Sequence, residues 1–563
     1  PAIVGRPVVR SRGNPGSSDP ATFIREAGGL ERDSEAVAEA LSGMFAIFEF
    51  DDRGIRVMTD RLGFRPVYVG HDAQGRIRSI GTYAESVAAA SGTGDRIDPV
   101  SVAELLVHNY ITFPFTTRTT MTELPPASIS TIDAAGAACQ NRVLWEPAEP
   151  AVFPDTSSMP GRISEAMREA ATDLTRGCDR IGVLLSGGAD SRAVLGAVLN
   201  SVDDPSRVSG VTYVTRENNE TRIASSIAES ARCAHVLVQR DEHYFPRMLR
   251  RGLSLLGCEL RGNCHGLGIA DNRLADRFDV IIGGQLSDTL LKDHFMSVSS
   301  RHAHRRASLR QRLRSFIPWR RHPQPESSMH HTTGRALLEP MLTDDIREQM
   351  RARRSARLEE VRQIRPQTAE VWNRFWPCSR QDDSAHTLGN TRITRGDTLF
   401  AHTAIIDVAS ELSLNARVDG VPANIAICQV CGPLARIENA NNGLPLDASA
   451  AQVRAARKAR RAKASPQTAQ TDDQAPWNAV ESSWVDPALM QRHAEEWISA
   501  RGQLVGSKGA AFLDRIVARG GDTLVGAYQD DLPSNTNHIA IQVGLWLDSV
   551  LETARPASAD GQG

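Results

Sequence analysis

The sequence has 563 residues, a formal net charge of −2 and an apolar content of 41%. This length is enough for about two to four globular domains, and the near-neutral charge gives no general attraction to nucleic acid or to a membrane surface. No run approaches the roughly 18 consecutive apolar residues of a membrane-spanning helix, and residues 1–13 lack the pattern of a signal peptide. The 8 cysteines are scattered along the chain, which favours a reducing, cytoplasmic compartment.

The first part of the chain, residues 1–145, has the pattern of a β-rich α+β domain. Residues 43–51 form an apolar run that ends in an Asp-Asp-Arg-Gly turn, and residues 55–59 follow as a second strand. Two such runs joined by a short turn predict a β-hairpin.

The most informative stretch is residues 181–199. Residues 181–185 are apolar and predict a buried parallel strand, and residues 192–199 have helical spacing. Between them lies the sequence Ser-Gly-Gly-Ala-Asp-Ser, which we call the SGGADS loop (residues 186–191). A glycine-rich turn at a helix N-terminus offers backbone N–H groups and the positive end of the helix dipole, so an anion-binding site is predicted.

Strands and helices alternate on both sides of this loop. Residues 208–214, 235–238 and 278–282 have the pattern of strands, and residues 161–174 and 221–231 that of helices. This alternation predicts a parallel sheet covered on both faces, within a second domain at residues 146–555 whose C-terminal part is helical. Ligands of such sheets bind beyond the carboxyl ends of the strands, where the SGGADS loop is expected.

The SGGADS loop resembles the pyrophosphate loop of N-type ATP pyrophosphatases. Residues 43–70 and 101–131 are similar to two segments of asparagine synthetases, and the three matches occur in the family's order. The chain is therefore identified as a member of the asparagine synthetase-like family. The resemblance implies an α/β protein in which a degenerate Ntn-type, glutaminase-like α+β domain precedes an adenine-nucleotide α-hydrolase-like synthetase domain.

The resemblance also implies ATP and Mg²⁺ as cofactors. Asp288 falls on the family's magnesium-binding aspartate, and Asp190 is the second carboxylate expected to bind the ion. The family's next glutamate is Thr289 here, and the competing interpretation of Asp288 is a helix cap. The nucleotide-binding positions carried over from the family are Leu184, Leu185, Ser186, Gly187, Gly188, Asp190, Ser191, Arg192, Val211, Gly283 and Gly284.

Two residues are expected to act in catalysis. Lys458, with Lys463 as the alternative, matches a family lysine that stabilises the transition states, although a solvent-facing helix would use such lysines too. The Tyr–Glu base of β-lactam synthetases has no counterpart, because no tyrosine lies between Tyr244 and Tyr528; Asp397 is the substitute carboxylate. Residues 464–480 are predicted to be a mobile linker and residues 556–563 a disordered tail.

A glutaminase of this family needs an N-terminal cysteine as nucleophile. The sequence begins with Pro1 and its first cysteine is Cys139, so we expect no glutamine hydrolysis, and the amine must come from the substrate. The favoured function is macrolactam closure of a lasso-peptide precursor, a step in the biosynthesis of ribosomally made, modified peptides. The alternatives are a small-molecule lactam or amide synthetase, including a glycan-amidating homologue, and a non-catalytic scaffold.

The expected partners follow from these functions. They are a peptide or small-molecule carboxylate and amine substrate, with a precursor-peptide protease and a leader-binding protein as further partners, and no nucleic acid or membrane. Arginines are frequent in residues 301–365. These arginines either cover solvated helix faces or form a docking surface for acidic groups.

Overall fold

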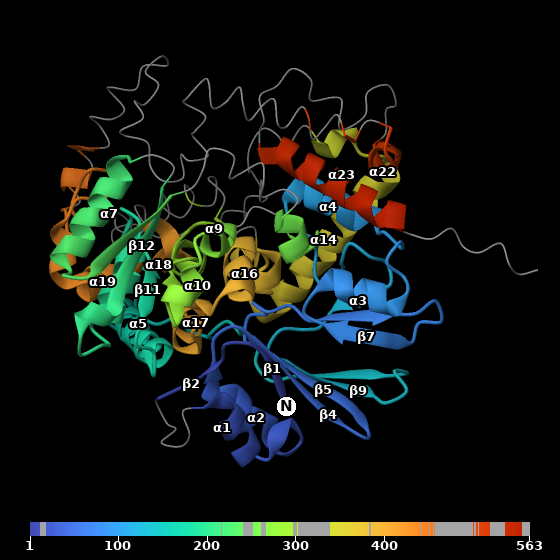
Figure 1. The fold of residues 1–563 in the computed structure, drawn as a ribbon, viewed down its shortest axis with the longest axis horizontal. Helices are drawn as coiled ribbons and strands as arrows, with labels where there is room; N and C mark the ends of the chain where they lie inside the picture. The colour runs from blue at the N-terminus through green and yellow to red at the C-terminus, as the bar shows by residue number, and fades with distance from the viewer. Residues whose placement is uncertain are drawn as a thin grey trace, which may run out of the picture.

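The structure is a computed structural model that describes residues 1–11, 19–214, 217–239, 251–260, 266–296, 301, 338–381, 384–440, 442–449, 451–453, 455–456, 499, 503–504, 506–517 and 535–553. Three parts are visible in Figure 1: β-rich layers at the N-terminus, a parallel sheet between helices, and a helical cluster. Several predictions lie outside the described residues, namely Lys458 and Lys463, the linker at 464–480, the tail at 556–563 and most of the arginine-rich stretch before residue 338.

The N-terminal part contains two antiparallel sheets. One has the strand order β1-β4-β5-β9-β10 and the other β7-β6-β8, and a separate short ribbon joins β2 and β3. The strands are β1 (Ala2–Gly5), β2 (Val8–Val9), β3 (Leu41–Ser42), β4 (Phe45–Asp51), β5 (Gly54–Thr59), β6 (Tyr68–His71), β7 (Ile77–Gly81), β8 (Met121–Glu123), β9 (Ser128–Asp133) and β10 (Cys139–Val143). The predicted hairpin is confirmed, because β4 and β5 pair antiparallel from Asp51 opposite Gly54.

The alternation of side chains along β4 explains how these sheets form layers. Phe45 and Ile47 pack against helices α1 (Pro20–Glu26) and α2 (Gly29–Ala40). Phe48 points to the opposite face and packs against the second sheet. Helix α3 (Ala84–Ser91) covers the outer face of that sheet. The result is a helix–sheet–sheet–helix arrangement, which confirms the expected α+β class (Figure 1).

The second domain is built on a five-stranded parallel sheet, as predicted. Its strand order is β13-β12-β11-β14-β15, and all four pairings are parallel. The first strand therefore lies in the middle, and successive connections move outward from it in opposite directions. This point is where parallel sheets open a crevice for ligands. The strands are β11 (Ile181–Leu184), β12 (Val208–Val214), β13 (Ala234–Gln239), β14 (Val280–Gly283) and β15 (Gly396–Thr398).

Helices cover both faces of the parallel sheet. Val183 on β11 points into the core shared with one helix layer, and Ile281 on β14 points into the core of the opposite layer. The first layer contains α5 (Met159–Thr175), α6 (Ala189–Leu199), α7 (Asn219–Ser230), α17 (Thr403–Ser410) and α19 (Val421–Cys431). The second contains α9 (Gly266–Asp271), α10 (Leu274–Arg277) and α16 (Ser384–Ile393).

The third part is a helical cluster that draws on both ends of the chain. Helix α4 (Pro99–His108) shares a core with α14 (Asp344–Ile364), α22 (Lys508–Ile516) and α23 (Asn535–Thr553). The segment at residues 101–131 is therefore no simple connection between domains. It packs α4 into this cluster and then returns as β8 and β9. The short helices are α11 (Ser287–Leu291), α15 (Ala369–Trp372), α18 (Leu414–Arg417), η1 (Pro205–Arg207), η2 (Glu339–Met341), η3 (Cys378–Arg380), η4 (Leu399–Ala401), η5 (Val418–Gly420) and η6 (Gly432–Arg436).

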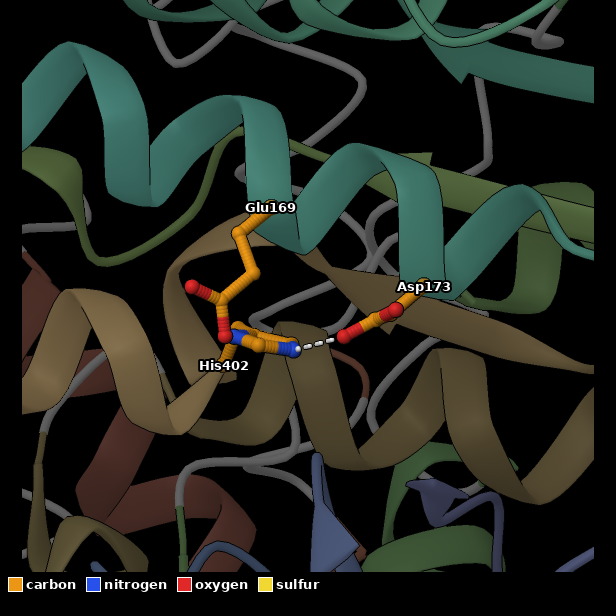
Figure 2. A group of neighbouring side chains, drawn as sticks. All are labelled: Glu169, Asp173 and His402. Carbon is orange, nitrogen blue, oxygen red and sulfur yellow. Dashed lines mark hydrogen bonds and ion pairs between the residues drawn. The ribbon is translucent and has the colours of Figure 1, made fainter. Parts of the chain in front are cut away.

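A polar clamp joins the N-terminal strand region to α5 and α17; its members are Arg10, Ser11, Glu169, Asp173 and His402. Figure 2 shows the last three, with the His402 ring between the two carboxylates. His402 Nδ1 accepts the N–H of Ala404 at 3.3 Å, so its Nε2 is assigned the proton that it donates to Asp173 at 3.2 Å. The backbone N–H of Ser11 reaches the same Asp173 carboxylate at 3.1 Å, and Arg10 pairs with Glu169 at 2.9 Å.

The side chains of Glu169, Asp173 and His402 place potential metal-ligand atoms within 4.8 Å of one another. The carboxylates already accept hydrogen bonds from Arg10, Ser11 and His402, so the group acts as a link between the domains. Among the described residues, no helix has both the length and the apolar character needed to cross a membrane.

Helices α6 and α19 approach closely at Gly196. A methyl group there would lie 2.8 Å from the carbonyl oxygen of Val430 and 3.0 Å from the Cα of Cys431. Both are backbone atoms, so Gly196→Ala must push the helices apart. We expect this variant to lose about 1–3 kcal/mol of unfolding free energy in urea titrations.

Gly161→Ala is the matched control, because Gly161 on α5 has open space around it. Alanine favours a helix more than glycine, so this variant should be neutral or up to about 1 kcal/mol more stable. Equal losses in the two variants would contradict the close-packing argument.

Candidate active site

The SGGADS loop lies between β11 and α6, as predicted, and its two serines hold its shape. Ser191 Oγ accepts the N–H of Ser186 at 3.0 Å and lies 2.8 Å from Ser186 Oγ. The Gly188 N–H donates to Ser186 Oγ at 3.2 Å. Gly188 is the N-cap of α6, and no side chain in the described part of the chain caps this helix end. Its first N–H groups and the helix dipole therefore form an anion site.

Two glycines are needed because backbone segments pass close to the loop. A methyl group on Gly187 would lie 2.7 Å from the Cβ of Ala440, whose N–H donates to the Gly187 carbonyl at 3.1 Å. A methyl group on Gly284 would lie 3.2 Å from the backbone N of Ser191. The loop after β14 thus lies directly against the start of α6, which brings the two predicted nucleotide segments together.

The other apolar positions assigned to nucleotide binding lie beside the loop, at the ends of β11 and β14 and in the middle of β12. Leu185 donates its N–H to the Val211 carbonyl at 2.8 Å, and its own carbonyl accepts the Thr212 hydroxyl at 2.8 Å. The side chains of Leu185 and Val211 are buried, whereas Leu184 is half-buried. Gly283 ends β14 in the neighbouring strand.

The two carboxylates predicted to bind magnesium are close together, and a lysine lies between them. Lys292 Nζ is 2.6 Å from Asp190 Oδ1 and 2.7 Å from Asp288 Oδ1. Asp190 Oδ1 also accepts the Ser287 hydroxyl at 2.7 Å. Burial by itself lowers the pKa of the Lys292 ammonium, but the two carboxylates outweigh it and raise the pKa above the ordinary value.

Residues 27–143 match the glutamine amidotransferase domain family, and residues 162–412 match the asparagine synthase family. Residues 162–412 thus form an asparagine synthase-family domain, preceded by an amidotransferase-family domain. The two matched segments correspond to the layered N-terminal domain and to the domain of the parallel sheet. A comparison with curated protein sequences found no significant match.

Members of the asparagine synthase family form amides with ATP and Mg²⁺, so the fit of this chain to a magnesium ion can be tested. The position shared by Asp190 and Asp288 is taken by the ammonium of Lys292, whose side chain is 15% exposed. The pair therefore does not fit an ion bridging the two carboxylates. Asp288 does not cap α11 either, because this helix begins at Ser287 and its N-cap is Leu286.

Arg192 does not reach the nucleotide side of this asparagine synthase domain, in contrast to the prediction. Its guanidinium is 0% exposed. It donates to the backbone carbonyls of Gly187, Leu434, Ile437 and Glu438 at 2.7–3.2 Å. Because its terminal nitrogens are used by carbonyls behind the loop, Arg192 supports the loop and the segment at 434–438 and offers no donor to a ligand.

Asp397, the predicted base, lies on β15 at the boundary between the two domains. Its side chain is 95% buried: its Oδ1 accepts the Thr398 N–H at 2.8 Å, and its Oδ2 would lie 3.9 Å from a methyl group on Gly43. Burial raises the pKa of Asp397 to about 7, although Arg6 and Arg65 oppose the rise. The side chain thus points toward the N-terminal domain, and its catalytic role stays a prediction.

Sequence reasoning missed Lys292 and Ser287. Asp288 and Lys292 are four residues apart, so opposite charges on one helical face were a signal for the contact between them. Ser287 and Lys292 both contact Asp190, which lies roughly a hundred residues earlier in the chain. No local pattern in the sequence indicated these contacts.

Replacing Asp397 should change how the free energy of unfolding depends on pH. An unfolded aspartate ionises near pH 4, whereas folded Asp397 stays protonated up to about pH 7. Between these values the folded state binds the extra proton, so rising pH reduces stability by about 1.4 kcal/mol per unit. Asp397→Asn removes this loss, so its stability relative to wild type should rise from pH 4.5 to pH 8 by a few kcal/mol in urea titrations.

The exposed Asp179 provides the control. Asp179→Asn should keep a constant difference from wild type over the same pH range. A pH-independent difference for Asp397→Asn as well would refute the raised pKa.

Arg192→Met should destabilise the domain although it changes no group that faces a ligand. Four backbone carbonyls, two of them in buried hydrogen bonds, would lose a donor, which costs about 1–3 kcal/mol or more. Arg222→Met is the control, because Arg222 contacts Glu438 in the same segment from the exposed surface at 2.7 Å. Urea unfolding of both variants measures the difference; a larger loss for Arg222→Met would contradict the supporting role of Arg192.

Proposed function

We propose that this chain forms amide bonds by activating a substrate carboxylate with ATP and passing the acyl group to an amine of the substrate. One observation carries the proposal: the uncapped start of α6, shaped by Ser186 and Ser191, lies at the middle of the parallel sheet. This is the place and the chemistry for a bound pyrophosphate group.

In the first step a carboxylate oxygen of the substrate attacks the α-phosphorus of ATP. The bond to the β-phosphate breaks, and pyrophosphate leaves with the electron pair. The N–H groups of the SGGADS loop hold the leaving charge, and the Lys292 ammonium lies beside them. In the second step the amine nitrogen attacks the acyl carbon, AMP leaves, and the amine loses a proton.

We infer the source of the amine from the residues of the N-terminal domain. Residues 1–138 offer no cysteine thiolate, the group with which such domains attack glutamine. We therefore assign it a structural role. It contacts α5 and α17 through the polar clamp and closes off Asp397 at the domain boundary.

An amine that is part of the substrate favours ring closure, and macrolactam formation in a lasso-peptide precursor is the form we propose. A precursor-peptide protease and a leader-binding protein would be its partners. The arginines of α14 give this proposal no added support. Arg353 pairs with Asp98 at 2.6 Å and Arg354 binds the Tyr110 hydroxyl at 2.8 Å, so these side chains attach α14 to the α4 segment.

A small-molecule lactam or amide synthetase, including a glycan-amidating enzyme, would use the same two steps. A non-catalytic scaffold is the second alternative. It is favoured by Thr289, which replaces a carboxylate of the family pattern and is buried against Gln381.

Exchange of labelled pyrophosphate into ATP separates these functions. We expect exchange with peptides that carry a free N-terminal amine and an Asp or Glu side chain, and no release of glutamate from glutamine. Asp190→Ala should reduce exchange at least a hundredfold, because it removes the partner of Lys292 and Ser287 beside the loop. Asp179→Asn, on the exposed surface, should exchange like wild type.

The other possible outcomes of the exchange assay would support different functions. Exchange with small acids but not with peptides would support a small-molecule synthetase. Binding of ATP without exchange for any acid would support a scaffold, and release of glutamate would refute the structural role of the N-terminal domain.

A further inference from the structure

The charges around Asp190 and Asp288 are balanced from within the chain. Lys292 Nζ bonds one oxygen of each carboxylate, at 2.6 and 2.7 Å. Asp190 belongs to the SGGADS loop and to the first turn of α6, and Asp288 is on α11 after β14. The ammonium thus connects the two loops that lie at the middle of the sheet.

The surrounding structure is shaped to hold the lysine in this position. Its side chain runs past Gly420, where a methyl group would lie 3.0 Å from Lys292 Cγ. Gly420 has φ +57°, a conformation that glycine adopts readily. The lysine stem therefore packs against the backbone at Gly420, and the Lys292 side chain is 15% exposed while that of Asp288 is 57% exposed.

Two carboxylates beside an anion site would repel a polyphosphate. The lysine changes the net charge of the group from −2 to −1, and a cation bonded to Asp190 of the loop attracts the leaving pyrophosphate. A divalent ion would do the same work, but it would need the oxygens that the ammonium occupies.

We infer that Lys292 is a tethered cation that takes the place of a metal ion between Asp190 and Asp288. The inference rests on the proposed nucleotide site and not on the identity of the substrate. It predicts that this pair holds no divalent ion of its own as long as Lys292 is present.

Binding of Mn²⁺ to the full chain, followed by electron paramagnetic resonance without nucleotide, tests the inference. We expect Asp288→Asn to bind as much Mn²⁺ as wild type, because wild type holds no ion at this pair. Lys292→Met keeps the length of the side chain without its charge, so it should bind Mn²⁺ at least tenfold more tightly than wild type. Adding Asp288→Asn to Lys292→Met should abolish the gain.

Lys508→Met serves as control, because Lys508 lies on α22 in the helical cluster and bonds only a carbonyl, that of Leu551, among the contacts described for it. It should not change Mn²⁺ binding. Asp288-dependent binding in wild type would overturn the inference, as would a Lys292→Met variant that folds and gains no site. Should that variant not fold, the comparison of wild type with Asp288→Asn still decides.

A second measurement addresses the attraction of the phosphates. In the presence of EDTA, calorimetry should show ATP binding to Lys292→Met at least tenfold weaker than to wild type, with Lys292→Arg close to wild type. Equal binding by all three proteins would refute the role of the tethered cation. Because neither test requires the carboxylate or the amine substrate, failure of the inference is distinct from failure of the proposed amide synthesis.

Discussion

The parallel pairing of β11 with both β12 and β14 is the constraint on which the site depends. Since β11 is the first strand of its sheet and yet lies in the middle, the connections on its two sides diverge. Two stretches about a hundred residues apart, the SGGADS loop and the loop after β14, therefore end at one edge. Gly284 favours their close contact, because a methyl group at this position would lie only 3.2 Å from the backbone N of Ser191.

Two buried arginines stabilise the fold by hydrogen bonds to backbone carbonyls. Arg192 and Arg417 are fully buried, and their terminal nitrogens donate to backbone carbonyls. Arg417 donates to carbonyls near the C-terminal ends of α11 and α17, and Arg192 donates to the loop and to the segment at 434–438. Lys292 differs because both of its partners are carboxylates, so its charge as well as its hydrogen bonds acts in the site.

The sequence was sufficient for those features that local pattern determines. The strand, turn and helix at residues 181–199, the hairpin of β4 and β5, and the parallel class of the second sheet were all predicted. Arg192 was assigned to the ligand because it directly follows the loop, yet on a helix it points behind the loop. Neither β15, with only three residues, nor the packing of α4 against α14 and α23 could be predicted, because both depend on contacts between distant parts of the chain.

The path of α4 has a consequence for dividing the protein. Leu105 and Leu106 of this helix are buried against the same core as Leu513 and Leu547 near the other end of the chain. A fragment that starts after the N-terminal domain would lose α4 and leave that core open to water on one side. A fragment that ends after β10 would carry α4 as an apolar helix without its partners. The amidotransferase-type domain and the asparagine synthase domain therefore form a single expression unit, although they match two separate families.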